Sequence, residues 1–398
     1  MSRIGIVIQR CHGSLVGGAE SLAWQWANLL KNEYQVEVLT TTALDAATWE
    51  NVLPQGDEER EGIKIRRFEV NQKRTPYWHE LHKLLLTHFR DPSFDSNPSY
   101  PPEKSLSWSL ALQEEFIYKQ GPYSEGLIDF LAGSSQDYKS LIFFTYLFPT
   151  TYYGIRKVPR EQCLFVPTLH DEAPAYLSAY RLMAKRARKL LWNTEAEKRL
   201  GILLWGELPG QVIGMGINTK EFSPNRPGYP YLLYCGRIDP FKGLPQLLNY
   251  FMRYKKEHPS ELRLVLTGRD ELGLPENPDI EFRGFVSEEE KFEWMGGALL
   301  FVMPSPHESL SIVTLEAMAQ GTPALVNGKS EVLAEHIKKS GGGFIYHDYH
   351  DFSTSVNDFL IDPSRGKAMS DKARNYVVTH YNVEDIRTIL MGVIEAVE

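Results

Sequence analysis

Short apolar segments, each followed by a stretch with helical periodicity, recur along the whole chain. In the first half they are Ile4–Ile8, Val36–Thr41, Ile142–Phe144, Leu164–Val166, Leu190–Trp192 and Val212–Ile213. In the second half they are Tyr231–Cys235, Leu262–Leu266, Ile280–Phe282, Leu299–Met303 and Ala324–Val326. Because these segments lack polar alternation, they predict parallel strands that helices cover on both faces. Two successive sets of alternating strands and helices predict two doubly wound α/β domains.

Breaks in this pattern divide the chain. Residues 218–230 contain three prolines and a glycine, and we interpret them as a linker between a domain at 1–217 and another at 231–380. Residues 381–398 predict a closing helix with Ile386, Ile389 and Val393 on one side. Residues 71–125 have no clear period, so we interpret them as an irregular insertion that is part helix and part loop.

Composition narrows the class of protein. A net charge of -8 argues against a protein that coats nucleic acid. The three cysteines are odd in number and lie far apart in the sequence, which fits a reducing compartment better than a disulfide framework or a metal cluster. No apolar stretch reaches about 18 residues, and the apolar run near the N-terminus is too short for a signal peptide. We therefore expect a cytoplasmic protein.

Residues 305–323, SPHESLSIVTLEAMAQGTP, place two acids around an apolar helix pattern. The helix is predicted from about Ser311 to Gln320, although Ser305 and Glu308 also match a capping box and allow an earlier start. Eight helical residues rise about 12 Å, so Glu308 and Glu316 are poorly spaced for a glycosidase-type carboxylate pair. Two alternatives remain. Either the acids make separate contacts on one elongated ligand, or Glu316 forms a structural ion pair and Glu308 caps the helix.

Three other loops follow predicted strands and carry candidate chemistry. Arg237 and Lys242 precede a helix that starts near Leu244, and they are either a diphosphate site or a pair of exposed basic residues. Gly17 and Gly18 open a helix, where they permit a close backbone approach to a ligand or form a tight turn; the pattern is not GxGxxG. His170 with Asp171 is either a site at a strand end or a packed loop.

Two charged stretches can be explained by ordinary structural roles as well as by ligand binding. Residues 346–351, YHDYHD, look metal-like, but acids at a predicted helix start favour capping. Residues 180–191 predict a basic helix, either a solvated face or a contact with anionic membrane through Arg181, Lys185 and Arg188. No Asp-x-Asp triplet, a common carrier of a metal-bound nucleotide diphosphate, occurs in the chain.

Taken together, these pieces resemble the GT-B family of retaining glycosyltransferases that is usually numbered family 4. The resemblance is strongest over about 231–330, where Arg237, Lys242, Gly284 and the Glu308–x7–Glu316 motif occur in the family's order. GGAE and HDEA match more loosely, and residues 71–125 do not match. Where many relatives have glycine near the first acid, this chain has Ser309, Leu310 and Ser311.

The resemblance implies two Rossmann-like domains facing across a cleft. It implies retaining transfer of a hexose-type sugar from a UDP- or GDP-sugar to a glycan or lipid-linked acceptor, in cell-envelope polysaccharide synthesis, without metal or other cofactor. In the donor site it implies diphosphate contacts from Arg237 and Lys242, and a sugar contact from Glu308. The remaining implied donor contacts come from Ser309, Leu310 and Ser311 near the phosphates, Glu316 at the ribose, Phe285 and Val286 at the base, and Gly17 and Gly18.

On the acceptor side the resemblance implies His170 beside the reacting carbon, with Asp171 next to it. The catalytic set is then His170, Glu308, Arg237 and Lys242, with no metal ligand and no nucleic-acid partner. Two alternatives from other classes remain: a sugar-nucleotide epimerase or hydrolase on the same fold, and a non-catalytic module that binds nucleotide sugars. A peripheral position on the inner face of the membrane, through the basic stretch at 180–191, is a further alternative for localisation.

Overall fold

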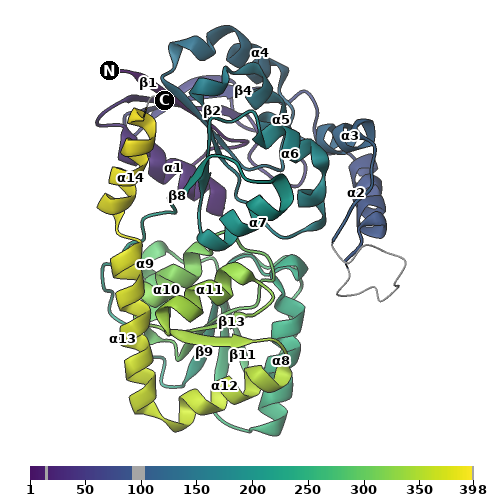
Figure 1. Cartoon of the computed structure of the whole chain (residues 1–398). Coiled ribbons are helices and arrows are strands. Elements are labelled where there is room, and N and C mark those ends of the chain that lie inside the picture. Colours follow the sequence, from purple (N-terminus) through teal and green to yellow (C-terminus); the bar gives the residue numbers. More distant parts are fainter. Residues whose placement is uncertain (14–16, 92–103, 397–398) are drawn as a thin grey trace. The chain divides into compact units, whose positions relative to one another are not determined.

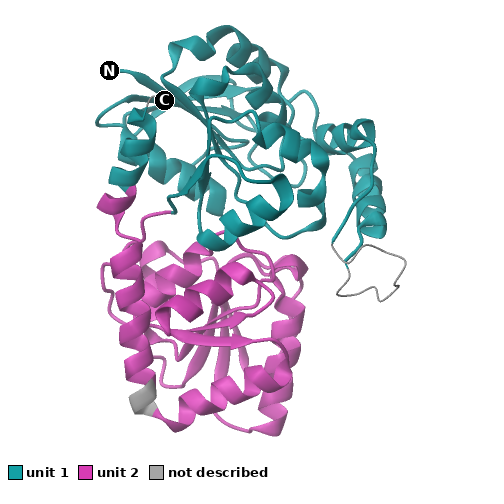
Figure 2. Ribbon diagram, viewed as in Figure 1, with its two compact units in different colours: residues 1–214, 387–398 teal, residues 215–386 magenta. Residues whose placement is uncertain are grey.

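The computed structural model describes residues 1–13, 17–91 and 104–396, without the side chains of 363–365. The chain divides into two compact units, which are coloured separately in Figure 2. Unit 1 is Met1–Gly214 together with Arg387–Glu398, and unit 2 is Met215–Ile386. Part of the predicted insertion, residues 92–103, lies outside the described residues.

Unit 1 is built on an eight-stranded sheet with the order β3-β4-β2-β1-β5-β6-β7-β8. Neighbouring strands are parallel except for the β3–β4 pair, which is antiparallel. The strands are β1 (Arg3–Val7), β2 (Gln35–Thr41), β3 (Gly56–Arg60), β4 (Ile63–Phe68), β5 (Ser140–Phe144), β6 (Cys163–Val166), β7 (Lys189–Trp192) and β8 (Gly210–Val212). Its helices are α1 (Gly18–Leu30), α2 (Pro76–His88), α3 (Leu110–Gln120), α4 (Glu125–Ser134), α5 (Pro149–Gly154), α6 (Ser178–Ala184), α7 (Glu195–Trp205) and most of α14 (Val383–Glu395), with 3₁₀ turns at η1 (Ser135–Asp137), η2 (Ile155–Lys157), η3 (Arg160–Gln162) and η4 (Ala173–Tyr176).

Unit 2 is built on a six-stranded parallel sheet with the order β11-β10-β9-β12-β13-β14. The strands are β9 (Tyr231–Cys235), β10 (Arg263–Thr267), β11 (Ile280–Gly284), β12 (Leu300–Met303), β13 (Ala324–Asn327) and β14 (Gly343–Tyr346). The helices are η5 (Pro240–Lys242), α8 (Leu244–Glu257), α9 (Glu288–Gly297), α10 (Ile312–Ala319), α11 (Glu331–Ser340), α12 (Tyr349–Ile361) and α13 (Pro363–His380), as labelled in part in Figure 1. The expectation of two Rossmann-like α/β domains is therefore confirmed.

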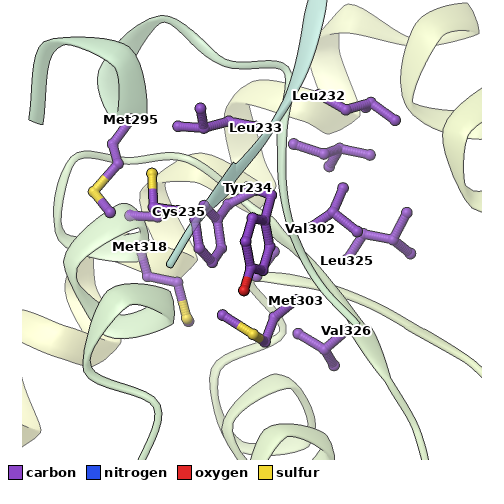
Figure 3. Close-up of a cluster of buried hydrophobic side chains, with 14 of the residues drawn as sticks. Leu232, Leu233, Tyr234, Cys235, Met295, Val302, Met303, Met318, Leu325 and Val326 are labelled. Atoms are coloured by element: carbon purple, nitrogen blue, oxygen red, sulfur yellow. The ribbon is translucent and has the colours of Figure 1, made fainter. Parts of the chain in front are cut away.

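Buried apolar strands explain why the carboxyl ends of β9 and β12 are fixed. Leu232, Leu233 and Tyr234 of β9 lie beside Val302 of β12 in the core of unit 2 (Figure 3). Every residue of these two strands is buried. Loops that leave such strands start from rigid positions, which is the usual arrangement for ligand sites in open α/β sheets.

The structure corrects the expectations for three segments. Strands β3 and β4 were not predicted, because β3 is an exposed edge strand of sequence GDEER and β4 alternates between buried and partly exposed residues. Residues 180–191 are not one helix, since α6 ends at Ala184 and Lys189 already begins a strand that pairs with β6 and β8. The region 71–125, expected to be an irregular mixture of helix and loop, contains the regular helices α2 and α3 in its described part.

The last helix, α14, contributes its C-terminal part to unit 1. Glu395 accepts a hydrogen bond from the Tyr34 hydroxyl and forms an ion pair with Lys139, whose Nζ lies 2.8 Å from Oε2. Arg387 pairs with Glu33 at 2.8 Å. These contacts fix the end of the chain beside the residues that directly precede β2 and β5.

Candidate active site

The loop after β9 is organised around Arg237 and Lys242. The buried Tyr234 hydroxyl donates to the Arg237 carbonyl at 2.6 Å, and Asp239 Oδ1 accepts from the Lys242 backbone N–H at 2.9 Å. Gly243 has φ 77°, and a Cβ there would lie 2.4 Å from the Pro304 carbonyl oxygen. Glycine at this position therefore allows the loops after β9 and β12 to touch.

The same contact brings Lys242 and Glu308 together. Lys242 Nζ lies 2.7 Å from Glu308 Oε1, and their side chains are 30% and 11% exposed. Helix α10 begins only at Ile312, so the earlier helix start at Ser305 is wrong, and Glu308 does not cap a helix. The Ser305 hydroxyl instead donates to the His307 carbonyl within the loop, at 3.0 Å.

Two side chains that sequence reasoning missed hold the loop between β12 and α10. Asn327 at the end of β13 donates to the Pro304 carbonyl at 2.9 Å. His336 of α11 bonds through Nε2 to the Leu310 carbonyl at 2.8 Å, and its Nδ1 lies 3.1 Å from the Tyr376 hydroxyl. A carbonyl can only accept, so Nε2 carries the proton and Nδ1 accepts from Tyr376. Burial lowers the pKa of His336 to about 4, which keeps the ring neutral at physiological pH.

The end of the braced loop is the N-terminus of α10. Ser311 has φ 63°, an unusual conformation for a residue other than glycine, and it is buried. Within the described residues, the backbone N–H groups of Leu310 and Ser311 have no acceptor from the chain itself. Together with the positive end of the helix dipole, these donors suit an anion.

Glu316 lies on α10 and has a different partner. Lys291 Nζ contacts both of its carboxylate oxygens at 2.9 Å. Burial raises the pKa of Glu316, and the Lys291 charge opposes that rise. The two acids of the motif thus belong to separate ion pairs, and the pairing of Glu316 matches the structural alternative that its spacing left open. Lys291 was not singled out from the sequence.

The carboxyl end of β11 adds an apolar surface in unit 2. Gly284 at the strand end has φ 68°, and the next residue, Phe285, is 74% exposed. Val286 beside it is partly buried. Because all six strands are parallel, these residues lie on the same edge of the sheet as Arg237 and Glu308.

In unit 1, His170 and Asp171 follow β6. His170 Nδ1 lies 3.6 Å from Glu172 Oε1, and that oxygen accepts from the Tyr146 hydroxyl at 2.7 Å. Asp171 forms an ion pair with Lys104 at 2.8 Å and accepts from Tyr176. His170 is thus partly exposed beside a carboxylate, whereas Asp171 is already engaged by the surrounding chain.

A buried acid, Glu197 of α7, holds the backbone beside His170. Its two oxygens accept from the N–H groups of Leu169 at 2.6 Å and Asn193 at 2.5 Å. Burial raises its pKa to about 7, although both hydrogen bonds and the nearby His170 lower it. Thr168, just before this segment, has φ 49°. Glu197 therefore fixes a strained turn, and its position in a helical pattern gave no sign of that role.

Gly17 and Gly18 begin α1, and the residues before them, 14–16, lie outside the described part. A Cβ on Gly17 would lie 2.2 Å from the Glu20 carboxylate. That carboxylate accepts from Arg10 Nε at 2.5 Å and from Gln9 Nε2 at 3.2 Å. A side chain at position 17 would therefore require the Glu20 carboxylate to shift.

The two charged stretches resolve into structural contacts. Arg188 donates to the Ala396 carbonyl at 2.6 Å, so it ties down α14; Arg181 and Lys185 lie exposed on and just after the short α6. This arrangement gives no support to a membrane-contacting basic helix. Asp348 accepts from the Asp351 N–H at 2.9 Å at the start of α12, which confirms the capping interpretation.

Neither a metal-binding group nor a membrane-spanning helix is found among the described residues. No three side chains of His, Cys, Asp or Glu in that part of the chain gather as a metal-binding group. None of the helices there combines the length and apolar composition that crossing a membrane requires.

Comparison with known proteins gives matches in sequence and in fold. Residues 217–376 match the family described as glycosyl transferases group 1. A D-inositol 3-phosphate glycosyltransferase 2 of Catenulispora acidiphila is 28% identical over 212 residues, which are 45% of this chain and 49% of that protein. A GDP-mannose-dependent alpha-(1-6)-phosphatidylinositol dimannoside mannosyltransferase of Mycobacterium tuberculosis is 24% identical over 189 residues, 42% and 48% of the two chains. The chain thus spans about half the length of these curated relatives.

Solved structures match over the whole length. Sucrose-phosphate synthase from Thermosynechococcus elongatus has a TM-score of 0.71 at 16% identity, covering 99% of this chain and 98% of that one. Anabaena HepE in complex with UDP and glucose has a TM-score of 0.69 at 14% identity, covering 100% of both chains. At such identities the likeness concerns the fold. Residues 217–376 of unit 2 thus match the glycosyl transferases group 1 family, and the chain has the two-domain GT-B fold.

Proposed function

We propose that this protein is a retaining glycosyltransferase. It moves a hexose-type sugar from a UDP- or GDP-sugar to a glycan or lipid-linked acceptor in cell-envelope polysaccharide synthesis. The observation that carries the proposal is the contact of Lys242 with Glu308, beside Arg237 and the N-terminus of α10, at one edge of the unit 2 sheet. The nucleotide-sugar donors in the relatives' names support the donor class, and a lipid-linked acceptor is supported by the mycobacterial relative.

The chemistry follows from charge. As the nucleoside diphosphate leaves, negative charge grows on its phosphates, and cations aimed at that position stabilise the transition state. Arg237, Lys242 and the N–H groups of Leu310 and Ser311 supply that stabilisation. When the diphosphate takes Lys242, Glu308 is released from its ion pair and can accept from the hydroxyls of the transferred sugar. The reaction needs no covalent enzyme nucleophile and, we propose, neither metal nor other cofactor.

The other assignments follow the same donor. We assign Glu316, shared with Lys291, to the ribose hydroxyls, and Phe285 with Val286 to the base. Ser309 belongs to the loop between β12 and α10, which we assign to the phosphates. In unit 1 we assign backbone contact with the donor to Gly17 and Gly18. Acceptor contact we assign to His170 and to Asp171.

Substitution of the two cations tests the proposal. Lys242→Ala and Arg237→Ala should each lower transfer by roughly 100-fold or more, as loss of one preorganised charge contact does elsewhere. Lys256→Ala, which removes an exposed lysine of α8 in the same unit, serves as the matched control and should leave transfer unchanged. Undiminished transfer in both cation variants would contradict the proposal.

Ligand binding tests it without an acceptor. In a thermal-shift panel of UDP, GDP, ADP and their sugars, a ligand at 100 times its Kd should stabilise the protein by about 2.7 kcal/mol. Conversion of a nucleotide sugar without acceptor would instead indicate an epimerase or hydrolase. Binding with no turnover on any acceptor would indicate a non-catalytic module, and no shift at all would remove the donor site.

A further inference from the structure

A second cation lies at the carboxyl edge of the unit 1 sheet, and none of the assignments above uses it. Arg74 follows β4 and immediately precedes α2. Its guanidinium lies over the ring of Trp78, 4.4 Å from the centroid, and 5.6 Å from the ring of Trp49. Its Nε donates to the Gln120 carbonyl at 3.2 Å. Arg74 as a whole is partly exposed.

The support under Arg74 is built by three separate segments. Trp49 Nε1 donates at 3.0 Å to the same Gln120 carbonyl that Arg74 uses. A Cβ on the next residue, Gly121, would lie 2.9 Å from the Trp49 ring and 3.1 Å from the backbone nitrogen of Arg74. Trp49 itself is fully buried with φ 63°, which is strained for a bulky side chain. A residue keeps such a conformation only where the surrounding structure holds it there, and residues of this kind cluster at ligand sites.

Arg74 lacks the counterion that comparable arginines have. Arg10 and Arg156, also partly buried in unit 1, pair with Glu20 and Glu114 respectively. Among the described residues no carboxylate lies within ion-pair distance of Arg74. Burial lowers the pKa of Arg74 to about 10, an effect that the more distant Asp45 only partly opposes. A poorly solvated cation without a partner is costly, and a bound anion would offset that cost.

The position of Arg74 connects it to the acceptor side of unit 1. The ring of His82, one turn further along α2, stacks on Trp78 with centroids 4.9 Å apart and planes 7° apart. Glu172, which lies beside His170, is also near enough to His82 to raise its pKa, while burial lowers it. Arg74 therefore lies on Trp78, which stacks on His82, and His82 is within electrostatic reach of Glu172 beside His170.

We propose that Arg74, held on Trp78 and Trp49, binds an anionic group of the acceptor, either a phosphate or a carboxylate. The planar guanidinium presents two parallel N–H donors, which match both of these groups. The identification of the ligand as an acceptor rests on the proposed function. The binding of an anion at Arg74 is independent of the proposed function.

Isothermal titration calorimetry on the full chain at low ionic strength tests the site. Glucose 6-phosphate, glucuronate and glucose are the probes, so the phosphate and carboxylate arms are separated. We expect one of the two anions to bind more tightly than glucose, and Arg74→Gln to weaken that anion by roughly tenfold or more. Arg186→Gln, a matched loss of an exposed charge in unit 1, and Lys242→Ala should leave the affinity within about twofold.

The inference is overturned if neither anion binds more tightly than glucose, if Arg74→Gln binds the anion as the wild type does, or if Lys242→Ala removes the binding. Because Arg74→Gln could disturb folding, a second measurement uses the wild type. Glucose 6-phosphate or glucuronate should slow the modification of Arg74 by phenylglyoxal, read by mass spectrometry of its peptide. An unchanged rate with both ligands contradicts the site.

The outcomes also separate this inference from the proposed function. If an anion binds at Arg74 but no nucleotide binds in unit 2, the proposed glycosyltransferase function is contradicted and the anion site is supported. In the opposite case, the wild type binds the donor and transfers sugar, and Arg74→Gln binds anions and acceptors as the wild type does. That result would support the glycosyltransferase and contradict the anion site.

Discussion

The two units hold their candidate residues in different ways. In unit 2, the loops after β9 and β12 touch directly, through Gly243 against Pro304 and Lys242 with Glu308. In unit 1, the candidate loops are held by side chains from elsewhere, such as Glu197 under the His170 loop and Gln120 under Arg74. The matched family segment covers unit 2 alone. On the proposed function, the direct contact in unit 2 belongs to the donor site, and the separately braced loops of unit 1 belong to the acceptor side.

The largest effect that would sharpen this comparison is a split between transfer and donor binding. His170→Ala should reduce transfer by roughly 100-fold, because a positioned polar group at the reacting centre contributes at least that much. The Kd for UDP, measured by calorimetry, should stay within about twofold. If His170→Ala abolished donor binding instead, the division of labour between the units would be wrong.

The second prediction concerns His336, which supports the loop between β12 and α10 in unit 2. His336→Ala should lower the free energy of unfolding by about 2–4 kcal/mol, since it opens a cavity and leaves the Leu310 carbonyl without its donor. UDP affinity should fall by roughly tenfold, and between pH 5.5 and 8 the loss should not depend on pH, because the ring is already neutral. His350→Ala, on an exposed histidine of α12, is the control. A destabilised variant with unaltered UDP affinity would reduce His336 to a packing residue.

The third prediction uses the raised pKa of Glu197 in unit 1. The folded protein holds this proton up to about pH 7, whereas an unfolded carboxyl releases it near 4.5. The folded state therefore binds more protons across that window, and its stability falls as the pH rises through it, by up to about 3 kcal/mol from this group. Glu197→Gln should flatten that dependence in urea unfolding curves taken from pH 4.5 to 7.5. Glu195→Gln on the exposed first turn of the same helix should not.

The smallest effect is expected at the tie between β7 and the end of the chain. Arg188→Ala should cost about 1 kcal/mol of stability, because it removes hydrogen bonds to the last turn of α14. Lys185→Ala, nearby and exposed, should cost less than about 0.5 kcal/mol. Equal effects would mean that Arg188 acts only through the general charge of the surface.

Much of the fold was predictable where burial makes the pattern plain. Tyr231–Cys235 was predicted with both ends as observed, because all five residues are apolar and buried. Strand β14 was missed because Gly343 begins it and only Tyr346 is fully buried. Strand β4 was missed because its alternating residues suit a sheet margin rather than the interior.

The candidate site shows where sequence pattern stops being informative. Lys242 and Glu308 could each be singled out from the loop that carries them, but 66 residues separate the two, and no local rule predicts their contact. Lys291 is 25 residues from Glu316 and lies in α9, whose sequence pattern gives no sign of this contact. His336 did leave a trace, since it falls on the apolar face of α11 between Ala334 and Ile337. A histidine on such a face indicates a buried hydrogen bond, but not its acceptor.

The ion pair of Lys242 with Glu308 affects which anions can bind at the proposed donor site. The lysine is already neutralised by a carboxylate that is largely shielded from water. An incoming anion must first displace that carboxylate, and a simple monovalent ion offers Lys242 nothing that Glu308 does not already provide. On the proposed function, a nucleotide sugar would make the exchange, because its two phosphates would also reach Arg237 and the α10 N-terminus, and its hydroxyls would give Glu308 new partners. The ion pair would then favour a ligand that carries both phosphates and hydroxyls over the free phosphate of the surrounding solution.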